Sequence, residues 1–151
     1  MKEATAESPV LSVPCAPDPL MSLLLRTAHA IERRLDDALE TVELSTPKYS
    51  ALTKLVQAGE PLALSELAAR MTCVRSNITQ LVDRLEADGL VHRVEDPRDR
   101  RSVRAALTSL GRQRQAAGEE RVAVVREVVV EILAGIDRGV LERALARLTG
   151  G

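Results

Sequence analysis

The stretch from Thr72 to Gly89 constrains the fold of this chain more than any other. Its apolar residues follow the i, i+3, i+4, i+7 spacing of a helix with one buried face: Ile78, Leu81, Val82 and Leu85. Gly89 stands where a left-handed residue ends such a helix. The opposite face and its flanks carry mostly short hydrogen-bonding side chains: Ser76, Asn77, Thr79, Gln80, Asp83 and Arg84. The stretch therefore predicts an amphipathic helix with an unusual polar face.

The polar face of this predicted helix has the chemistry that reads DNA bases. Asn and Gln side chains pair bidentately with adenine, Ser and Thr hydroxyls bond to either partner of a base pair, and a Thr methyl contacts the thymine methyl. Solvated helices more often carry Glu and Lys in mixed pairs. We therefore expect this helix to lie in a major groove, and the alternative is a solvated face on an ordinary helix.

The composition predicts one domain whose core is built by helix packing. A chain of 151 residues is long enough to bury roughly two thirds of the surface of its unfolded state. It has one Tyr and neither Phe nor Trp, so Leu, Val, Ala and Ile must fill the core. The expected fold class is mainly α (α+β).

Basic residues are concentrated in the middle of a chain that is nearly neutral overall. Residues 1–45 hold 4 basic and 8 acidic side chains, residues 46–111 hold 10 and 8, and residues 112–151 hold 7 and 6. Within the middle segment, arginines crowd into one short stretch: Arg93, Arg98, Arg100, Arg101 and Arg104. A local positive patch of this kind favours a nucleic-acid contact, although a charge run also occurs as a solvated loop.

The sequence lacks the patterns of a membrane protein, a secreted protein or a metalloenzyme. No apolar run approaches the ~20 residues of a membrane span, and the first residues have neither the basic start nor the apolar centre of a signal peptide. We therefore expect a cytoplasmic protein in which Cys15 and Cys73 are reduced. His29 and His92 lie on different predicted elements, without a metal-binding or catalytic pattern beside them. We expect no enzyme activity, no cofactor and no metal.

Proline, glycine and apolar periodicity predict the elements before the opening stretch. Residues 1–17 are rich in proline and have little periodicity, so they predict a mobile tail. Asp18-Pro19 and Thr46-Pro47 each have the pattern of a helix cap followed by a first-turn proline. We expect helices from Pro19 to about Val42, from Thr46-Pro47 to Gly59 and from Ser65 to Met71, with a short strand at Leu62–Leu64.

The elements after the opening stretch predict a hairpin and two further helices. Strand-like segments at 90–95 and 103–107 are joined by the highly charged loop 96–102. A long helix is expected from a cap at Thr108 through the valine-rich run Val122 to Leu133, with Gly135 ending it, and a last helix begins at Asp137. Four apolar residues of that last helix are expected to face inward: Val140, Leu141, Leu145 and Leu148.

Two short helices around a tight turn, the second with a polar exposed face, predict a helix-turn-helix. The hairpin that follows is placed to reach a neighbouring minor groove or phosphate groups with its arginines. Together these features favour DNA binding over a solvated surface.

At this point the residues resemble the MarR-type winged helix-turn-helix regulators. The resemblance covers Leu44 to Gly111, through the segments LSTPKYSAL, LSELAARM, LVDRLEADGLVHR and DPRDRRSVRAALTSLG. The last segment is the most specific, since Asp99-x-Arg101 followed by Leu107-Thr108-x-x-Gly111 resembles the wing of the family and the start of its long helix. Val74 departs from the capping Ser, Thr or Asp that the family more often has.

The resemblance implies a homodimeric regulator, expected to be a repressor, that binds pseudo-palindromic DNA. It implies that Arg101 enters the minor groove, that Asp99 orients it, and that Ser76, Asn77, Thr79 and Gln80 are recognition positions. We expect DNA contacts from one set of side chains: Ser65, Arg75, Ser76, Asn77, Thr79, Gln80, Arg84, Arg98, Asp99, Arg100 and Arg101.

The terminal helices are expected to form the dimer. They carry more apolar surface than the small winged domain can cover, and Val128-Val129-Val130 places apolar groups on several faces of one helix. Packing of these helices within a monomer is the alternative. The expected organisation is a flexible tail (1–17), an N-terminal dimerisation helix (18–45), a winged helix-turn-helix DNA-binding domain (46–108) and C-terminal dimerisation helices (109–151).

Control of DNA binding is the least determined part of this interpretation. The resemblance implies a small aromatic or anionic effector, for which His29, Arg33 and Tyr49 are pocket candidates. A second hypothesis is redox sensing through Cys73, beside the start of the recognition helix, or through Cys15. A third is a winged helix that serves as a protein-interaction module without specific DNA binding.

Overall fold

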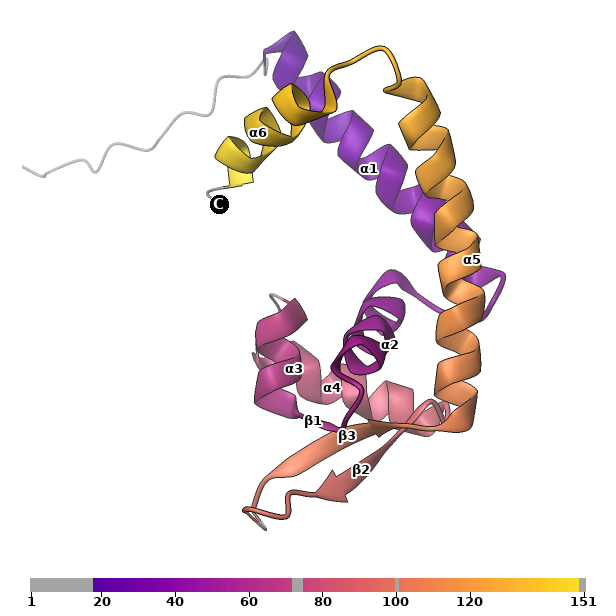
Figure 1. The fold of residues 1–151 in the computed structure, drawn as a ribbon, viewed down its shortest axis with the longest axis vertical. Helices are drawn as coiled ribbons and strands as arrows, with labels where there is room; N and C mark the ends of the chain where they lie inside the picture. Colours follow the sequence, from indigo (N-terminus) through magenta and orange to yellow (C-terminus); the bar gives the residue numbers. More distant parts are fainter. Residues whose placement is uncertain (1–17, 72–74, 100, 150–151) are drawn as a thin grey trace, which may run out of the picture. The chain divides into compact units, whose positions relative to one another are not determined.

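The computed structural model describes residues 18–71, 75–99 and 101–149. The described elements are α1 (Pro19–Glu40), α2 (Thr46–Ala58), β1 (Leu62–Ala63), α3 (Leu64–Met71), α4 (Arg75–Ala87), β2 (Val91–Glu95), β3 (Val103–Leu107), α5 (Ser109–Ile132) and α6 (Arg138–Thr149) (Figure 1). The chain divides into two compact units, residues 1–32 and residues 33–151, so α1 begins in the first unit and ends in the second. The mainly helical fold with one small sheet confirms the predicted fold class.

α1 begins where Asp18-Pro19 predicts. The Asp18 carboxylate accepts a hydrogen bond from the Leu20 N–H at 2.7 Å and so caps the helix. Within the first unit, the large apolar side chains of α1 are exposed: Leu20, Met21, Leu23, Leu24 and Leu25. Within the second unit, Leu39 at the end of α1 is completely buried. Among the described helices, α1 included, none has the length and apolar character that crossing a bilayer requires.

α2 differs from the prediction at its start and agrees with it at its end. Ser45 is the N-cap and Thr46 is the first helical residue, so the prediction of Thr46 as the cap was wrong. The reason is that the Thr46 hydroxyl has another partner, the carboxylate of Asp36 on α1, to which it donates at 2.6 Å. Gly59 ends α2 with a φ of 71°. Glycine is favoured in this left-handed conformation because it has no Cβ.

The three strands form one antiparallel sheet in the order β1-β3-β2. β2 pairs with β3 from Val91 opposite Leu107 to Glu95 opposite Val103, which confirms the two predicted strands. β1 adds to the free edge of β3 and is only two residues long. We call the β2–β3 hairpin, with the connection 96–102, the wing.

α4 buries the face that its sequence predicts. Ile78, Val82 and Leu85 are at most 1% exposed, and Leu81 is half-buried. Gly89 has a φ of 71° and ends the helix as a left-handed residue, which confirms its predicted role. The described helix begins at Arg75, and Val74 lies outside the described residues.

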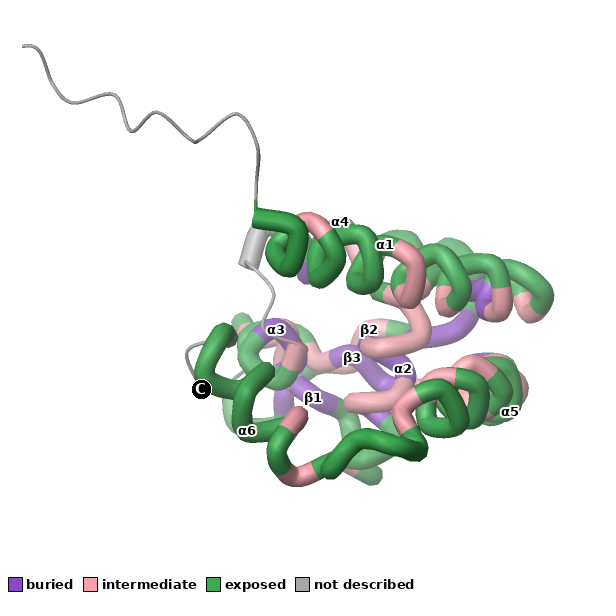
Figure 2. Tube along the Cα trace, turned by 90° about the horizontal axis from the view of Figure 1, so that it is seen from above, coloured by how far each residue is buried: buried purple, intermediate pink, exposed green. Residues whose placement is uncertain are grey.

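The buried core lies in the second unit and joins α2, α3, α4 and the sheet. Its completely buried large side chains include Leu39, Leu52, Leu67, Val82 and Leu85. Figure 2 shows buried residues gathered on these elements, whereas α6 is almost entirely exposed. The core is aliphatic, as the composition predicts, and it holds the helix-turn-helix and the wing on one support.

α5 begins as predicted and ends earlier than predicted. The Thr108 hydroxyl accepts a hydrogen bond from the Gly111 N–H at 2.9 Å and donates to the Gly89 carbonyl at 2.7 Å, so the cap also ties α5 to the end of α4. The helix ends at Ile132 with Leu133 as its C-cap, so the prediction that Gly135 ends it was wrong. A turn over residues 133–135 replaces its last residues.

α6 begins after the predicted cap, since Asp137 accepts a hydrogen bond from the Val140 N–H at 2.9 Å. In the single chain, the prediction that the apolar face of α6 is turned inward is wrong. Val140 is 54% exposed, Leu145 44% and Leu148 71%, and only Leu141 is half-buried. The helical periodicity is present, but the described residues of this chain do not cover that face.

Candidate nucleic-acid interface

The outer face of α4 presents polar side chains to solvent. Asn77, Thr79, Gln80 and Arg84 are all exposed, and none has a side-chain hydrogen bond or ion pair with another described residue. Ser65, at the start of α3, is exposed as well. Amide and hydroxyl groups that are left without protein partners on a rigid helix can bond to the edges of bases.

Some predicted site residues cannot be placed. Cys15, Cys73 and Arg100 lie outside the described residues, as do the side chains of Arg75 and Ser76. The redox hypothesis and the roles expected of Arg75, Ser76 and Arg100 therefore remain predictions.

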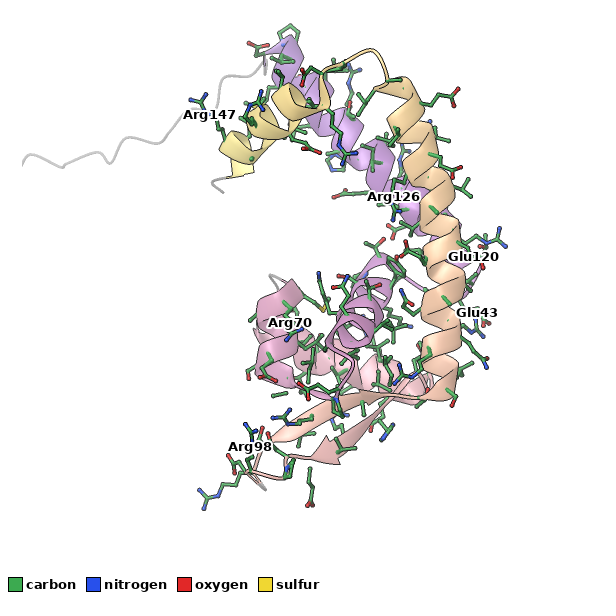
Figure 3. The ribbon with its side chains drawn as sticks, in the orientation of Figure 1. Glu43, Arg70, Arg98, Glu120, Arg126 and Arg147 are labelled. Atoms are coloured by element: carbon green, nitrogen blue, oxygen red, sulfur yellow. The ribbon has the colours of Figure 1, made fainter. Side chains whose placement is uncertain are left out.

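The tip of the wing is shaped by Asp99. Its carboxylate accepts a hydrogen bond from the Arg101 N–H at 2.9 Å, and its carbonyl accepts one from the Ser102 N–H at 2.8 Å. Asp99 therefore holds the backbone of the turn that carries Arg101. Arg98 and Arg101 are exposed and form no ion pair with any described residue, and Figure 3 shows Arg98 at the tip of the hairpin.

Two other arginines of the basic stretch, Arg93 and Arg104, are bonded to acidic side chains of the protein. Arg93 on β2 forms ion pairs with Asp83 and Glu86 on α4. Arg104 on β3 donates from Nε to Asp96 at 2.7 Å. Charge counting did not distinguish these two arginines from Arg98 and Arg101. The spacing of Asp83 and Glu86, three residues apart on one helix face, was the available signal.

Asp96 is buried at the base of the wing, with only 7% of its surface exposed. It accepts hydrogen bonds from the Arg98 N–H at 2.9 Å and from Arg104. These bonds, the backbone one first, lower the pKa of the Asp96 carboxyl below its usual range. Asp96 is therefore ionised at neutral pH and neutralised by its partner.

The three effector-pocket candidates have different environments. His29 is exposed, and its Nδ1 donates to the Leu25 carbonyl of the same helix at 2.7 Å. Arg33 is exposed. Tyr49 is half-buried between α2 and α5, and its hydroxyl donates to Glu119. The ligand roles of these residues stay predictions.

Sequence reasoning did not identify the partners of Tyr49 on α5. Glu119 also pairs with Arg126 at 3.1 Å, and Gly118 packs directly beneath the tyrosine ring. Burial, followed by the hydrogen bond to Glu119, raises the pKa of the Tyr49 phenol, and that same bond lowers the pKa of Glu119. The cluster links α2 to α5.

A second link lies at the turn between α1 and α2, where sequence reasoning again named no partner. Arg114 on α5 donates from Nη1 to the Val42 carbonyl at 2.9 Å and forms an ion pair with Glu43. Glu43 has a φ of 57°, which is uncommon for a residue with a side chain. The two contacts hold this turn in its left-handed conformation.

The closely spaced helices α3 and α4, followed by the β2–β3 wing, define a winged helix-turn-helix. The MarR family model matches residues 44–103, which span α2 to the start of β3. A protein of Thauera aromatica named for transcriptional regulation of the hcr operon is 31% identical over 125 residues, covering 83% of this chain and 75% of that protein. The chain belongs to the MarR family, whose members are transcriptional regulators and not enzymes.

Solved structures of the same fold extend over most of the chain. CouR from Rhodococcus jostii RHA1 with p-coumaroyl-CoA is 30% identical, with a TM-score of 0.71, and the match covers 87% of this chain and 90% of CouR. CouR bound to a 23-mer DNA duplex is 28% identical, with a TM-score of 0.75, and the match covers 86% and 92%. Several curated relatives match over a shorter stretch, and the chain spans 44–60% of their length.

Proposed function

We propose that this protein is a sequence-specific DNA-binding regulator of transcription that acts as a repressor. The observation that carries the proposal is the exposed polar face of α4 beside a wing whose arginines Arg98 and Arg101 have no ion-pair partner among the described residues. A helix in the major groove would read base edges, while the wing arginines would reach the adjacent minor groove and its phosphates. CouR, a repressor of the same fold, has been solved on DNA.

The proposed active form is a homodimer. Large apolar side chains are exposed on α5, on α6 and in the connection between them, as well as on α1: among them Val124, Val130, Ile132, Ile136 and Leu148. Between α5 and α6 lies a groove of about 440 Å³ lined by Val130, Leu133, Ile136, Leu141 and Leu145, with several charged neighbours. An apolar surface of this extent favours association, and a two-fold dimer would present two winged domains to a palindromic site.

A small-molecule effector is the proposed control. CouR of the same family has been solved with p-coumaroyl-CoA, which supports a ligand of aromatic and anionic character. A ligand releases DNA only if it prefers the dimer geometry that separates the recognition helices from their grooves. The links of Arg114 to the α1–α2 turn and of Tyr49 to α5 are where such a change would be transmitted.

The test is a binding titration of the unmodified protein on the DNA upstream of its own gene and on random DNA of equal length. We expect binding to the upstream DNA that is at least about 10³-fold tighter than to random DNA at the same salt concentration. Equal affinity for the two DNAs would contradict specific recognition. Absence of binding to both would instead favour a winged helix that binds a protein partner.

A further inference from the structure

The five arginines between positions 93 and 104 have two different kinds of environment where the structure describes them. Arg98 and Arg101 at the wing tip are exposed, whereas Arg93 and Arg104 at the wing base are only 27% and 20% exposed. The guanidinium N–H groups of the two basal arginines also donate hydrogen bonds to acceptors of the protein. The basic stretch is therefore not one uniform phosphate-binding surface.

Arg93 joins the first strand of the wing to α4. Its guanidinium contacts Asp83 and Glu86, which are three residues apart on one face of the helix. The backbone N–H of Arg93 also donates to Glu86, at 3.1 Å. A planar guanidinium can bridge two carboxylates at once, a geometry that an ammonium group does not reproduce.

Arg104 joins the second strand of the wing to the segment that precedes β1. Its Nε donates to Asp96 at 2.7 Å, and its Nη1 donates to the Pro61 carbonyl at 3.1 Å. Asp96 in turn accepts the Arg98 N–H at 2.9 Å, so the same carboxylate holds the beginning of the wing connection. Among the described residues, Asp96 is the only buried charged side chain.

These contacts fix the wing at its base on both strands. DNA recognition by a helix and a wing together requires a set distance between them, because the major and minor grooves that they enter are a fixed distance apart. The ion pairs of Arg93 join the wing to α4 and so bear on that distance, whereas the contacts of Arg104 hold the wing connection and tie β3 to the segment before β1. The base of the wing, which carries the exposed arginines of the tip, is therefore already ordered before DNA binds, and binding does not have to order it.

We propose that Arg93 and Arg104 are positioning residues that do not themselves contact DNA. Arg93 holds the wing against α4, and Arg104 holds the wing connection through Asp96 and ties β3 to the segment before β1. This inference rests on the proposed DNA-binding function. It divides the basic stretch into tip arginines that meet the nucleic acid and basal arginines that place the tip.

The test removes an acid from each contact without removing an arginine. Asp96→Asn and Glu86→Gln each delete one negative charge near the proposed DNA surface. If charge alone mattered, both changes would tighten DNA binding, because phosphate repulsion falls. If the contacts position the wing, both changes weaken binding to the specific site, by about threefold to thirtyfold. The matched control is Glu95→Gln, an exposed acid on β2 outside both contacts, which should not weaken binding.

A second arm asks whether the effect acts through the wing tip. In the Arg101→Ala background, Asp96→Asn should cause little further loss, since the misplaced arginine is already absent. Additive losses, or tighter binding after Asp96→Asn, would overturn the proposal. Arg104→Lys keeps the charge but cannot reach Asp96 and Pro61 with the same fork, so it should behave like Asp96→Asn at an unchanged salt dependence.

A third arm needs no DNA and separates this inference from the proposed function. Hydrogen exchange in the free protein should become faster at the amides of Arg98 and Ser102 after Asp96→Asn, while the buried amides of α2 keep their exchange rates. Unchanged exchange at the wing in a protein that binds DNA would overturn the positioning role alone. Failure of the unmodified protein to bind any DNA would overturn the proposed function and the inference with it.

Discussion

At the scale of single residues, the role of a side chain depends more on its interaction partner than on its residue type. Arg101 and Arg104 are three residues apart, yet one is exposed at the wing tip and the other is bonded to a buried carboxylate. The same holds on α4, where Asp83 is paired with Arg93 and Gln80 has no described partner. We expect the polar groups without a described partner to be available to DNA, whereas the partnered ones hold the surface in shape.

Substitutions at the proposed reading positions test this division. Gln80→Ala and Asn77→Ala should weaken binding to the specific site by about 1–3 kcal/mol and have little effect on random DNA, because each removes a base contact. Arg101→Ala should weaken binding to both DNAs and flatten the salt dependence, because it removes a charge from the minor groove. Titrations at several salt concentrations measure both effects. Equal losses on both DNAs for Gln80→Ala would show that Gln80 does not read bases.

Tyr49 offers a residue-scale measurement in the free protein. It is the only aromatic residue besides the histidines, so phenolate absorbance reports on this residue alone. Burial and the bond to Glu119 raise its pKa, so the titration midpoint should lie above the ordinary value of about 10. Because the folded pKa is the higher one, the contribution of Tyr49 to stability is complete below about pH 10 and is lost as the pH rises through the folded value.

The control for this titration is Glu119→Gln. It should lower the midpoint, but not to the ordinary value, because burial, the larger cause, remains. A midpoint of about 10 in the unmodified protein would contradict the contact between α2 and α5.

At the scale of elements, the junction between the wing and α5 depends on the absence of a side chain. A Cβ added at Gly111 would lie 2.0 Å from the Leu90 carbonyl oxygen, which belongs to backbone and cannot easily move. Alanine usually stabilises a helix relative to glycine by about 0.5–1 kcal/mol. Gly111→Ala should instead destabilise the protein by about 2 kcal/mol or more, measured by chemical unfolding.

Gly139→Ala is the matched change on α6. The atoms that its Cβ would meet include the end of the flexible Arg143 side chain at 3.2 Å, which can move aside. This substitution should be neutral or slightly stabilising. Similar losses at both positions would show that the close approach at Gly111 has no energetic consequence.

The elements predicted correctly from sequence are those that local chemistry determines. Gly89 ends α4 and Thr108 caps α5 because these residues act on their own neighbours along the chain or close to it. The strands of the wing were located by their flanking turn residues and apolar content. The end of α5 was misplaced because its last turn is broken by residues 133–135 without a strong sequence signal, and Gly135 has no special backbone conformation among those described.

The candidate site was predictable in part for the same reason. The polar face of α4 follows from helical periodicity, and its exposed residues Asn77, Thr79 and Gln80 lie where the sequence predicts. The division among the arginines was not predictable, since it depends on contacts between β2 and α4 and between β3 and Pro61. These contacts join segments that only the folded chain brings together.

At the scale of the whole molecule, the apolar face of α6 stays largely exposed among the residues that the structure describes. The helical spacing of Val140, Leu145 and Leu148 anticipates a packed face, yet all three are exposed in the single chain. Three exposed aliphatic side chains on one short helix are costly in water and favour burial against another surface. In the proposed homodimer, a second copy of the chain would supply such a surface, and it would also give two recognition helices for two half-sites.

Leu148→Glu tests the dimer without disturbing the fold of the chain, because Leu148 is 71% exposed. Light scattering at micromolar concentration should give the mass of two chains for the unmodified protein and a lower average mass for the variant. DNA affinity should fall together with the mass, since one winged domain engages only one half-site. Helix content in circular dichroism should stay the same.

The control is Arg147→Glu, an exposed polar position one residue away, which should retain the dimer. A monomeric mass for the unmodified protein would contradict the dimer and leave the exposed leucines of α6 to another partner.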